Sequence, residues 1–360
     1  MKPDTVRAFI LRYQHQLSIG SFFVGFFIDT LALKRIDLLF SNLLLYTYLT
    51  VAIFTIFTLH AYAARLEAKG KIAHFLMWVP FVGQFAFGGM FSGFLIFYSQ
   101  SGSVLASWPF LLLIVALLAA NEFMRSYQSK LTYQSLLIFF CLFSFSIYSV
   151  PIAVGRMGDL VFEASGLIAL ALFALLLSAL SFIDFKRVKS SLHNIVIGSV
   201  AIYGLITALY FSNVLPPIPL ALKDIGVYYS VERVTGGYRV TETPESFRDR
   251  FSRQVVYLVQ GENLFAFSSV FAPTALSTSI QHRWERYDRE SGTWITMSTI
   301  PFSINGGRDG GYRGYTTADI TEAGLWRVSV ETLRGQLIGR HSFEVHMSTS
   351  TEPRSVRILE

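Results

Sequence analysis

The chain has 360 residues, of which 52% are hydrophobic and only 15% are charged, and its formal net charge is +6. Residues 1–212 carry 14 Lys/Arg against 8 Asp/Glu, whereas residues 213–360 carry 16 of each, so the basic excess does not form the basic face of a nucleic-acid-binding domain. The single cysteine, Cys141, excludes an intrachain disulfide and a multi-cysteine metal site.

Seven stretches are apolar enough, and close enough to the required length of about 20 residues, to be predicted as membrane-spanning helices. They lie at roughly 17–33, 38–61, 76–98, 104–122, 132–154, 160–183 and 192–212. With a cytoplasmic N-terminus, the short loops place 11 Lys/Arg on the cytoplasmic side and 3 on the other, as the positive-inside rule requires. The sequence therefore predicts a polytopic transmembrane domain over 1–212, with the C-terminal domain outside the cytoplasm.

The composition changes at a Pro-rich linker over 213–222, which contains Pro216-Pro217-Ile218-Pro219. Beyond the linker, apolar and polar residues alternate, as in Trp326-Arg327-Val328-Ser329-Val330-Glu331, a pattern typical of half-buried strands. Gly- and Asp-rich turn segments separate these stretches. An all-β, immunoglobulin-like sandwich is therefore predicted over 223–348, followed by a flexible C-terminal tail over 349–360.

One segment of the soluble half has a different spacing. Phe247, Phe251, Val255 and Leu258 recur at helical intervals, so a short helix within 244–260 is compatible with the pattern.

Several motifs carry a resemblance to a known family. They are Gly306-Gly307-Arg308-Asp309-Gly310-Gly311-Tyr312-Arg313-Gly314-Tyr315, Gly324-Leu325-Trp326-Arg327-Val328, and Gly335-Gln336-Leu337-Ile338-Gly339-Arg340 with Phe343 and Val345. With the run Gly25–Leu31 and the entry Pro216–Leu220, the pattern resembles uncharacterised bacterial multi-span membrane proteins that end in a domain of unknown function. The resemblance covers nearly the whole chain. It implies a bacterial inner-membrane protein with a periplasmic β domain, and it implies no reaction, ligand or catalytic residue.

Asp29 is an ionisable residue inside the first predicted span, where a charge costs about 2.5–3.5 kcal/mol on insertion scales. One interpretation is a polar ligand or proton site at the outer mouth of the bundle, together with Arg35 and Asp37. The favoured interpretation is an interfacial salt bridge to Arg35 or Lys34 that locks the turn between the first two helices.

Asp159 and Glu163 are four residues apart, so they share one helix face at the outer start of the sixth span. Helix capping and pairing with Arg156 is the favoured explanation, because carboxylates are stabilised at a helix N-terminus. The alternative is a cation or proton entry site shared with Asp29.

Small residues also recur in the third span. Gly89 and Gly93 form a GxxxG motif, which favours close helix packing, more simply within the chain than between chains.

The Gly-rich segment 306–314 is expected to form a tight, bulged hairpin from which Arg308 and Arg313 project. With Tyr312 and Tyr315 it is a candidate loop for binding an anionic glycan or a partner protein, because Arg suits bidentate contacts and aromatic stacking. The favoured alternative is a set of cross-strand pairs between Arg and Asp or Glu.

No catalytic residue, metal site or cofactor is predicted, because the chain has no HExxH motif, nucleophile–base pattern or Walker A loop. The expected function is non-enzymatic binding or anchoring, in which the periplasmic domain binds a partner protein, glycan or lipid headgroup and the lipid bilayer surrounds the helices. The alternative is a small-molecule or lipid transporter that uses Asp29. The oligomeric state is not predicted.

Overall fold

The computed structural model describes residues 26–33, 38–65, 78–123, 130–244, 253–274, 276–308, 310–350 and 352–359. The chain divides into two compact units. The first comprises Met1–Ser99, Trp108–Ala153 and Gly158–Ser212, and the second comprises Gln100–Ser107, Val154–Met157 and Asn213–Glu360.

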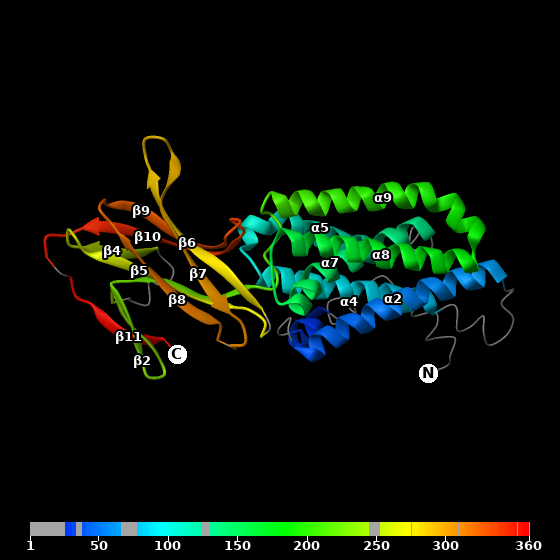
Figure 1. Ribbon diagram of the computed structural model, residues 1–360, viewed down its shortest axis with the longest axis horizontal. Coiled ribbons are helices and arrows are strands. Elements are labelled where there is room, and N and C mark those ends of the chain that lie inside the picture. The colour runs from blue at the N-terminus through cyan, green and yellow to red at the C-terminus, as the bar shows by residue number, and fades with distance from the viewer. Residues whose placement is uncertain are drawn as a thin grey trace, which may run out of the picture. The chain divides into compact units, whose positions relative to one another are not determined.

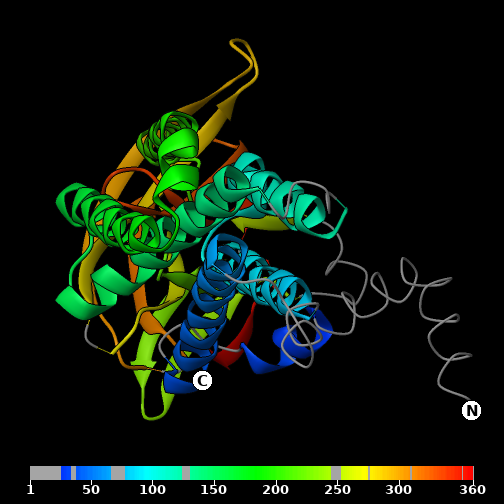
Figure 2. The same cartoon turned by 90° about the vertical axis from the view of Figure 1, so that its right-hand side faces the viewer.

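The first unit is helical (Figures 1 and 2), and residues 26–32 precede its labelled helices. These are α2 (Leu39–Arg65), α4 (Val79–Gln100), α5 (Val104–Phe123), α7 (Leu131–Val154), α8 (Asp159–Ile183) and α9 (Phe185–Phe211). Within the described part of the chain, five of them are long and apolar enough to cross a membrane, and α5 has a shorter apolar stretch, Ala106–Asn121. Residues 17–25 of the first predicted span, 17–33, lie outside the described residues.

Small residues bring α2 and α4 together. A Cβ atom on Gly89 would lie 2.5 Å from Tyr48 Cε2, and one on Gly93 would lie 2.6 Å from Leu45 Cδ2. The two glycines of the GxxxG motif therefore receive side chains of α2, which agrees with the expected packing within the chain.

The outer faces of α8 and α9 are apolar. Leu160 and Phe182 on α8 are 87% and 82% exposed, and Val200 on α9 is 67% exposed. Such surfaces suit contact with lipid, in which apolar side chains lose nothing by exposure.

The second unit contains the β domain, built from strands β1 to β11. A central sheet has the order β1-β5-β8, a five-stranded sheet has the order β4-β10-β9-β6-β7, and an outer sheet has the order β11-β3-β2. The pairing of β4 with β10 is parallel, and the other described pairings are antiparallel. The bounds are β1 Ala221–Tyr228, β2 Ser230–Val234, β3 Gly237–Glu242, β4 Gln254–Leu258, β5 Asn263–Phe271, β6 Ser277–Asp288, β7 Thr293–Asn305, β8 Tyr312–Asp319, β9 Gly324–Thr332, β10 Leu337–Met347 and β11 Ser355–Leu359.

Alternation along β5 shows how the three sheets stack. Leu264 and Ala266 pack into a core with Trp284 of the five-stranded sheet. Phe267, on the other face of the central sheet, packs with Val240 of the outer sheet. The central sheet therefore packs against another sheet on each face, and the domain has one layer more than the two-sheet sandwich expected from the sequence.

Two segments differ from their expected structure. Residues 355–359, expected within a flexible tail, form β11, whose backbone pairs with β3. The candidate helix within 244–260 contains β4, in which Val256 and Leu258 are buried two residues apart, and residues 245–252 lie outside the described residues. Strand β11 pairs with β3, and β4 pairs with β10. These partners are distant in the sequence, so the pairing leaves no pattern in the local spacing of residues.

The Gly-rich segment connects two sheets. It follows β7 of the five-stranded sheet and precedes β8 of the central sheet, so it is a crossover, in contrast to the expected hairpin. A Cβ atom on Gly306 would overlap the carbonyl of Pro273, and Gly311 has φ +84°. Glycine is needed at 306 because the backbone of Pro273 leaves no room for a side chain. It is favoured at 311 because the backbone there adopts a left-handed conformation.

Candidate functional site

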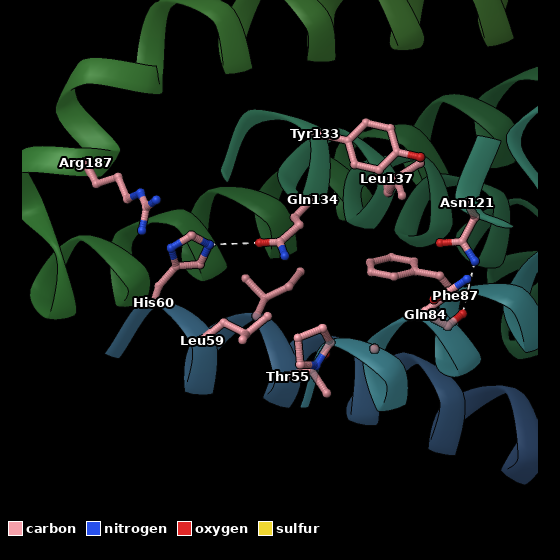
Figure 3. A pocket seen from close by; sticks show the side chains of 13 residues that line it. Thr55, Leu59, His60, Gln84, Phe87, Asn121, Tyr133, Gln134, Leu137 and Arg187 are labelled. Atoms are coloured by element: carbon pink, nitrogen blue, oxygen red, sulfur yellow. Dashed lines mark hydrogen bonds between the residues drawn. The ribbon is translucent and has the colours of Figure 1, made fainter. Parts of the chain in front are cut away.

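A cavity of about 310 Å³ lies within the helical unit (Figure 3). It is lined by Thr55, Ile56, Leu59 and His60 of α2; Pro80, Gly83, Gln84 and Phe87 of α4; Asn121 of α5; Tyr133, Gln134 and Leu137 of α7; and Arg187 of α9. These residues come from the C-terminal parts of α2 and α5 and the N-terminal parts of α4, α7 and α9. Because the helices alternate in direction, those parts share one end of the bundle.

His60 is a buried polar group of the pocket. It is 2% exposed, and its Nε2 atom lies 2.8 Å from Oε1 of Gln134. Because an amide oxygen can only accept, Nε2 carries the hydrogen in this arrangement. The Nδ1 atom is buried and has no hydrogen-bond partner among the described residues. Figure 3 shows the guanidinium of Arg187 pointing toward the imidazole, on the side away from Gln134.

A second polar group lies at the other end of the pocket (Figure 3). Asn121 Nδ2 donates to the carbonyl oxygen of Gln84 at 3.0 Å. The hydroxyl of Tyr133 is buried without a hydrogen-bond partner in the described part of the chain. Phe87 and Leu137 line the space between the two ends. The pocket thus has two polar ends and an apolar middle.

The chemistry of the lining is that of a binding site. The lining side chains offer hydrogen bonds, one permanent positive charge at Arg187 and one imidazole at His60. None of the described lining residues is acidic or a cysteine, and the described residues contain no cluster of three or more His, Cys, Asp or Glu that could hold a metal ion. A polar molecule can be oriented here by both polar ends.

None of the residues that line this pocket is among the site residues predicted from the sequence. A signal was available, because His60 and Gln134 interrupt predicted spans with polar groups, as Asp29 does. What the sequence did not contain was their convergence, since they are 74 positions apart.

Asp29 occupies a different environment from the pocket. It is 5% exposed, and Tyr48 of α2 donates to its Oδ1 atom at 3.0 Å. The same tyrosine ring packs over Gly89, so the carboxylate is held by the closely packed α2–α4 pair. Arg35 and Asp37 lie outside the described residues, and the expected salt bridge to Arg35 stays a prediction.

Asp159 and Glu163 project from α8 toward tyrosines of α9. Tyr210 donates to Asp159 Oδ1 at 2.9 Å, and Tyr203 donates to Glu163 Oε2 at 2.8 Å. The ring of Tyr210 also stacks on Phe162, with ring centroids 3.8 Å apart. These contacts tie α8 to α9, whereas Tyr48, which donates to Asp29, belongs to α2.

The predicted binding loop of the β domain is divided between two faces of the central sheet. Tyr312 packs against the buried core cluster, and exposed Arg308 has its Cζ atom 5.4 Å from the Tyr312 ring. Tyr315 lies on the other face, 44% exposed, beside the rings of Tyr238 and Phe265. Because β8 residues alternate in direction, half-buried Arg313 shares the face of Tyr315.

Cross-strand pairs between Arg and Glu are present on the five-stranded sheet. Arg327 donates to both carboxylate oxygens of Glu285, at 2.6 and 2.9 Å. Arg283 donates to Glu331 at 2.6 Å. The two glutamates are 3% and 1% exposed, so these pairs are buried.

His282 of the β domain contacts two hydroxyl groups. Its Nε2 atom lies 2.7 Å from Ser268 Oγ, and its Nδ1 atom lies 2.9 Å from Thr316 Oγ1. The side chain is fully buried, and this burial lowers the pKa of His282 to about 4. The Ser–His contact is therefore part of the core, closed to a substrate.

Part of the chain matches a known protein family. Residues 277–345 match the family described as "Protein of unknown function (DUF2914)". The C-terminal region therefore contains a domain of unknown function. This confirms that part of the resemblance seen in the sequence. No curated protein matches the chain.

Several solved structures align with the chain at low similarity. A β-glucosidase from Listeria innocua aligns at 13% identity and TM-score 0.19 over 34% of this chain and 16% of the enzyme. An immunoglobulin-like protein from Pseudomonas aeruginosa aligns at 14% identity and TM-score 0.19 over 34% of this chain and 97% of that protein. An alkylpurine DNA glycosylase from Pseudomonas fluorescens aligns at 14% identity and TM-score 0.23 over 87% and 99%. This chain spans only 16% of the β-glucosidase, and TM-scores this low define no shared fold.

Proposed function

We propose that this protein is a bacterial inner-membrane protein that binds a small polar solute in the pocket of its helical bundle. The observation that carries the proposal is the buried Nδ1 atom of His60, which has no hydrogen-bond partner among the described residues and lies in an apolar helix at the pocket. Ionisable groups are costly inside a membrane and mark substrate or ion pathways. Pockets that combine apolar walls with a few placed polar groups bind small molecules.

The charge distribution supports an orientation for this pocket. Seven spans with a cytoplasmic N-terminus place Lys69, Lys71, Lys186, Arg187 and Lys189 on the cytoplasmic side. The pocket belongs to the same end of the bundle, because Arg187 begins α9 there. In this orientation the β domain, which we assign to an immunoglobulin-like sandwich with an added sheet, is periplasmic.

Thiol labelling tests whether the pocket is open to water. In a Cys141→Ala background, we expect Thr55→Cys to react with an anionic, membrane-impermeant methanethiosulfonate in inside-out vesicles. The rate should be at least about tenfold that of Phe54→Cys, because thiol reactivity requires the hydrated thiolate. Phe54 is the matched control, since it is the neighbouring residue and is 63% exposed on the outer surface of the bundle.

Equal rates for the two cysteines would contradict a water-filled pocket. Reaction of Thr55→Cys only in right-side-out vesicles would contradict the orientation and leave the pocket intact.

The β domain supports a second candidate function, the binding of a periplasmic partner protein, glycan or lipid headgroup. The favouring observation is that exposed Tyr315 and half-buried Arg313 share one face of the central sheet beside Tyr238. Aromatic rings and guanidinium groups together suit anionic glycans. The full-length protein should be retained on an immobilised anionic glycan, and Arg313→Ala with Tyr315→Ala should weaken retention about tenfold. Exposed Arg233→Ala is the control and should leave retention unchanged. Unchanged retention of the double variant would refute glycan binding at this face.

A further inference from the structure

We infer that the pocket of the bundle takes an oxyanion with an apolar body, a carboxylate or a phosphate whose charged end lies between Arg187 and His60. The inference rests on the proposed function and names its ligand class. It follows from the charge of the lining, from the unpartnered atom of His60 and from the order of polar and apolar side chains along the pocket.

The charge of the lining is positive. Arg187 stays protonated under all ordinary conditions, and the described lining contains no carboxylate to balance it. The nearest acidic residue in sequence, Asp184, accepts from the backbone N–H of Arg187 at 3.1 Å and caps α9. A cationic ligand at this end of the pocket would therefore be repelled by Arg187.

The unpartnered atom of His60 completes the anion site. Nε2 is engaged with Gln134 at 2.8 Å, which fixes the plane of the imidazole. Nδ1 faces the guanidinium of Arg187 (Figure 3). Because Nε2 carries the hydrogen in this arrangement, Nδ1 of the neutral imidazole is an acceptor, and it can donate to an oxyanion only after the ring takes up a proton. With that proton, an oxyanion between the two side chains accepts one charge-assisted hydrogen bond from Arg187 and one from Nδ1–H. A neutral ligand offers no compensation for the arginine charge.

The rest of the pocket specifies the body of the ligand. Leu59, Phe87 and Leu137 supply apolar contacts beyond the charged end (Figure 3). Asn121 and the Tyr133 hydroxyl lie at the far end. The fitting ligand therefore has an anionic head and an apolar middle, with room for a second hydrogen-bonding group.

Matched probes of equal shape test the charge. The full-length protein in phosphatidylcholine nanodiscs should bind benzoate, and it should bind the neutral isostere benzamide at least about tenfold more weakly, as measured by calorimetric titration. Arg187→Gln should weaken benzoate binding about tenfold or more and leave benzamide binding unchanged. Lys189→Gln removes the same charge two residues away, where Nζ lies over the Phe185 ring, and should leave benzoate binding unchanged.

The outcomes separate this inference from the proposed function. Equal binding of benzoate and benzamide, or equal losses in Arg187→Gln and Lys189→Gln, would overturn the anion site. If Thr55→Cys is labelled from the cytoplasmic side but neither probe binds, the solute pocket stands and the ligand class is refuted. Competition between benzoate and phosphatidylglycerol added to the nanodiscs would support the anion site and assign it to a lipid headgroup. Binding unaffected by that lipid would support it and assign it to a soluble anion.

Discussion

Replacing Arg327 by methionine lowers the free energy of unfolding of the β domain by about 3 kcal/mol. The carboxylate of Glu285 is 4% exposed and lies 2.6 Å from Arg327 Nε, so the substitution leaves a buried charge without its bidentate partner. The effect is at the lower end of the range for such pairs, because Arg283 Nε still lies 3.9 Å from the carboxylate. The guanidinium also stacks on Trp294 at 4.1 Å, a contact that methionine replaces in part.

Pulse proteolysis of the full-length protein in urea measures this loss. Arg239→Met is the matched control, because Arg239 and Glu232 are 3.8 Å apart with side chains 52% and 66% exposed. An exposed pair of this kind contributes less than about 1 kcal/mol. Adding Glu285→Gln to Arg327→Met should recover part of the loss, since the buried group is then neutral. Equal losses for Arg327→Met and Arg239→Met would show that the buried pair does not stabilise the domain.

Acidification from pH 7 to pH 4 lowers the free energy of unfolding of the β domain through His282. Burial lowers the pKa of His282 to about 4 in the folded protein, whereas its ordinary value is about 6.5. Between these values the unfolded chain binds the extra proton and the folded chain does not, so stability falls as the pH falls. The stability is fully present above about pH 6.5, and the full loss is about 3 kcal/mol at about 1.4 kcal/mol per pKa unit.

Comparison with His282→Gln isolates this residue from the carboxylates. Burial raises the pKa of Glu331, whereas the pKa of Glu285 is lowered because Arg327 and the neighbouring charges outweigh its burial. Both groups stay in the variant, so the difference between the two urea profiles reports His282 alone. Glutamine can still bond Ser268 and Thr316, and it should abolish the dependence between about pH 6.5 and 4. An unchanged slope in the variant would show that another group titrates.

The helices could be predicted closely because one local property decides them. Twenty apolar residues in succession span a bilayer only as a helix, and the predicted span 132–154 corresponds to α7, Leu131–Val154. Strands β6, β9 and β10 were equally visible, because a strand with one buried face alternates residue by residue. Strand β11 was not visible, because Val356 and Ile358 are 64% and 56% exposed and only pairing with β3 orders them.

The candidate site was likewise predictable from the sequence only in part. Asp29 was recognisable as a buried charge, but its partner Tyr48 is 19 positions away, and the ring reaches it because Gly89 leaves room. The pocket needs groups from five helices, of which His60 and Gln134 are 74 positions apart. Neither arrangement has a local signature.

By itself, the sequence determined the apolar helical half, the neutral β half and the boundary between them at the proline-rich segment. Hydropathy and charge are sums over neighbouring residues, so no contact has to be known to evaluate them. Only the tertiary structure decided which polar groups meet: Tyr48 with Asp29, Gln134 with His60, Arg327 with Glu285. The free energy of each pair depends on burial and on distances of about 3 Å, which are set by the packing of segments distant in the chain.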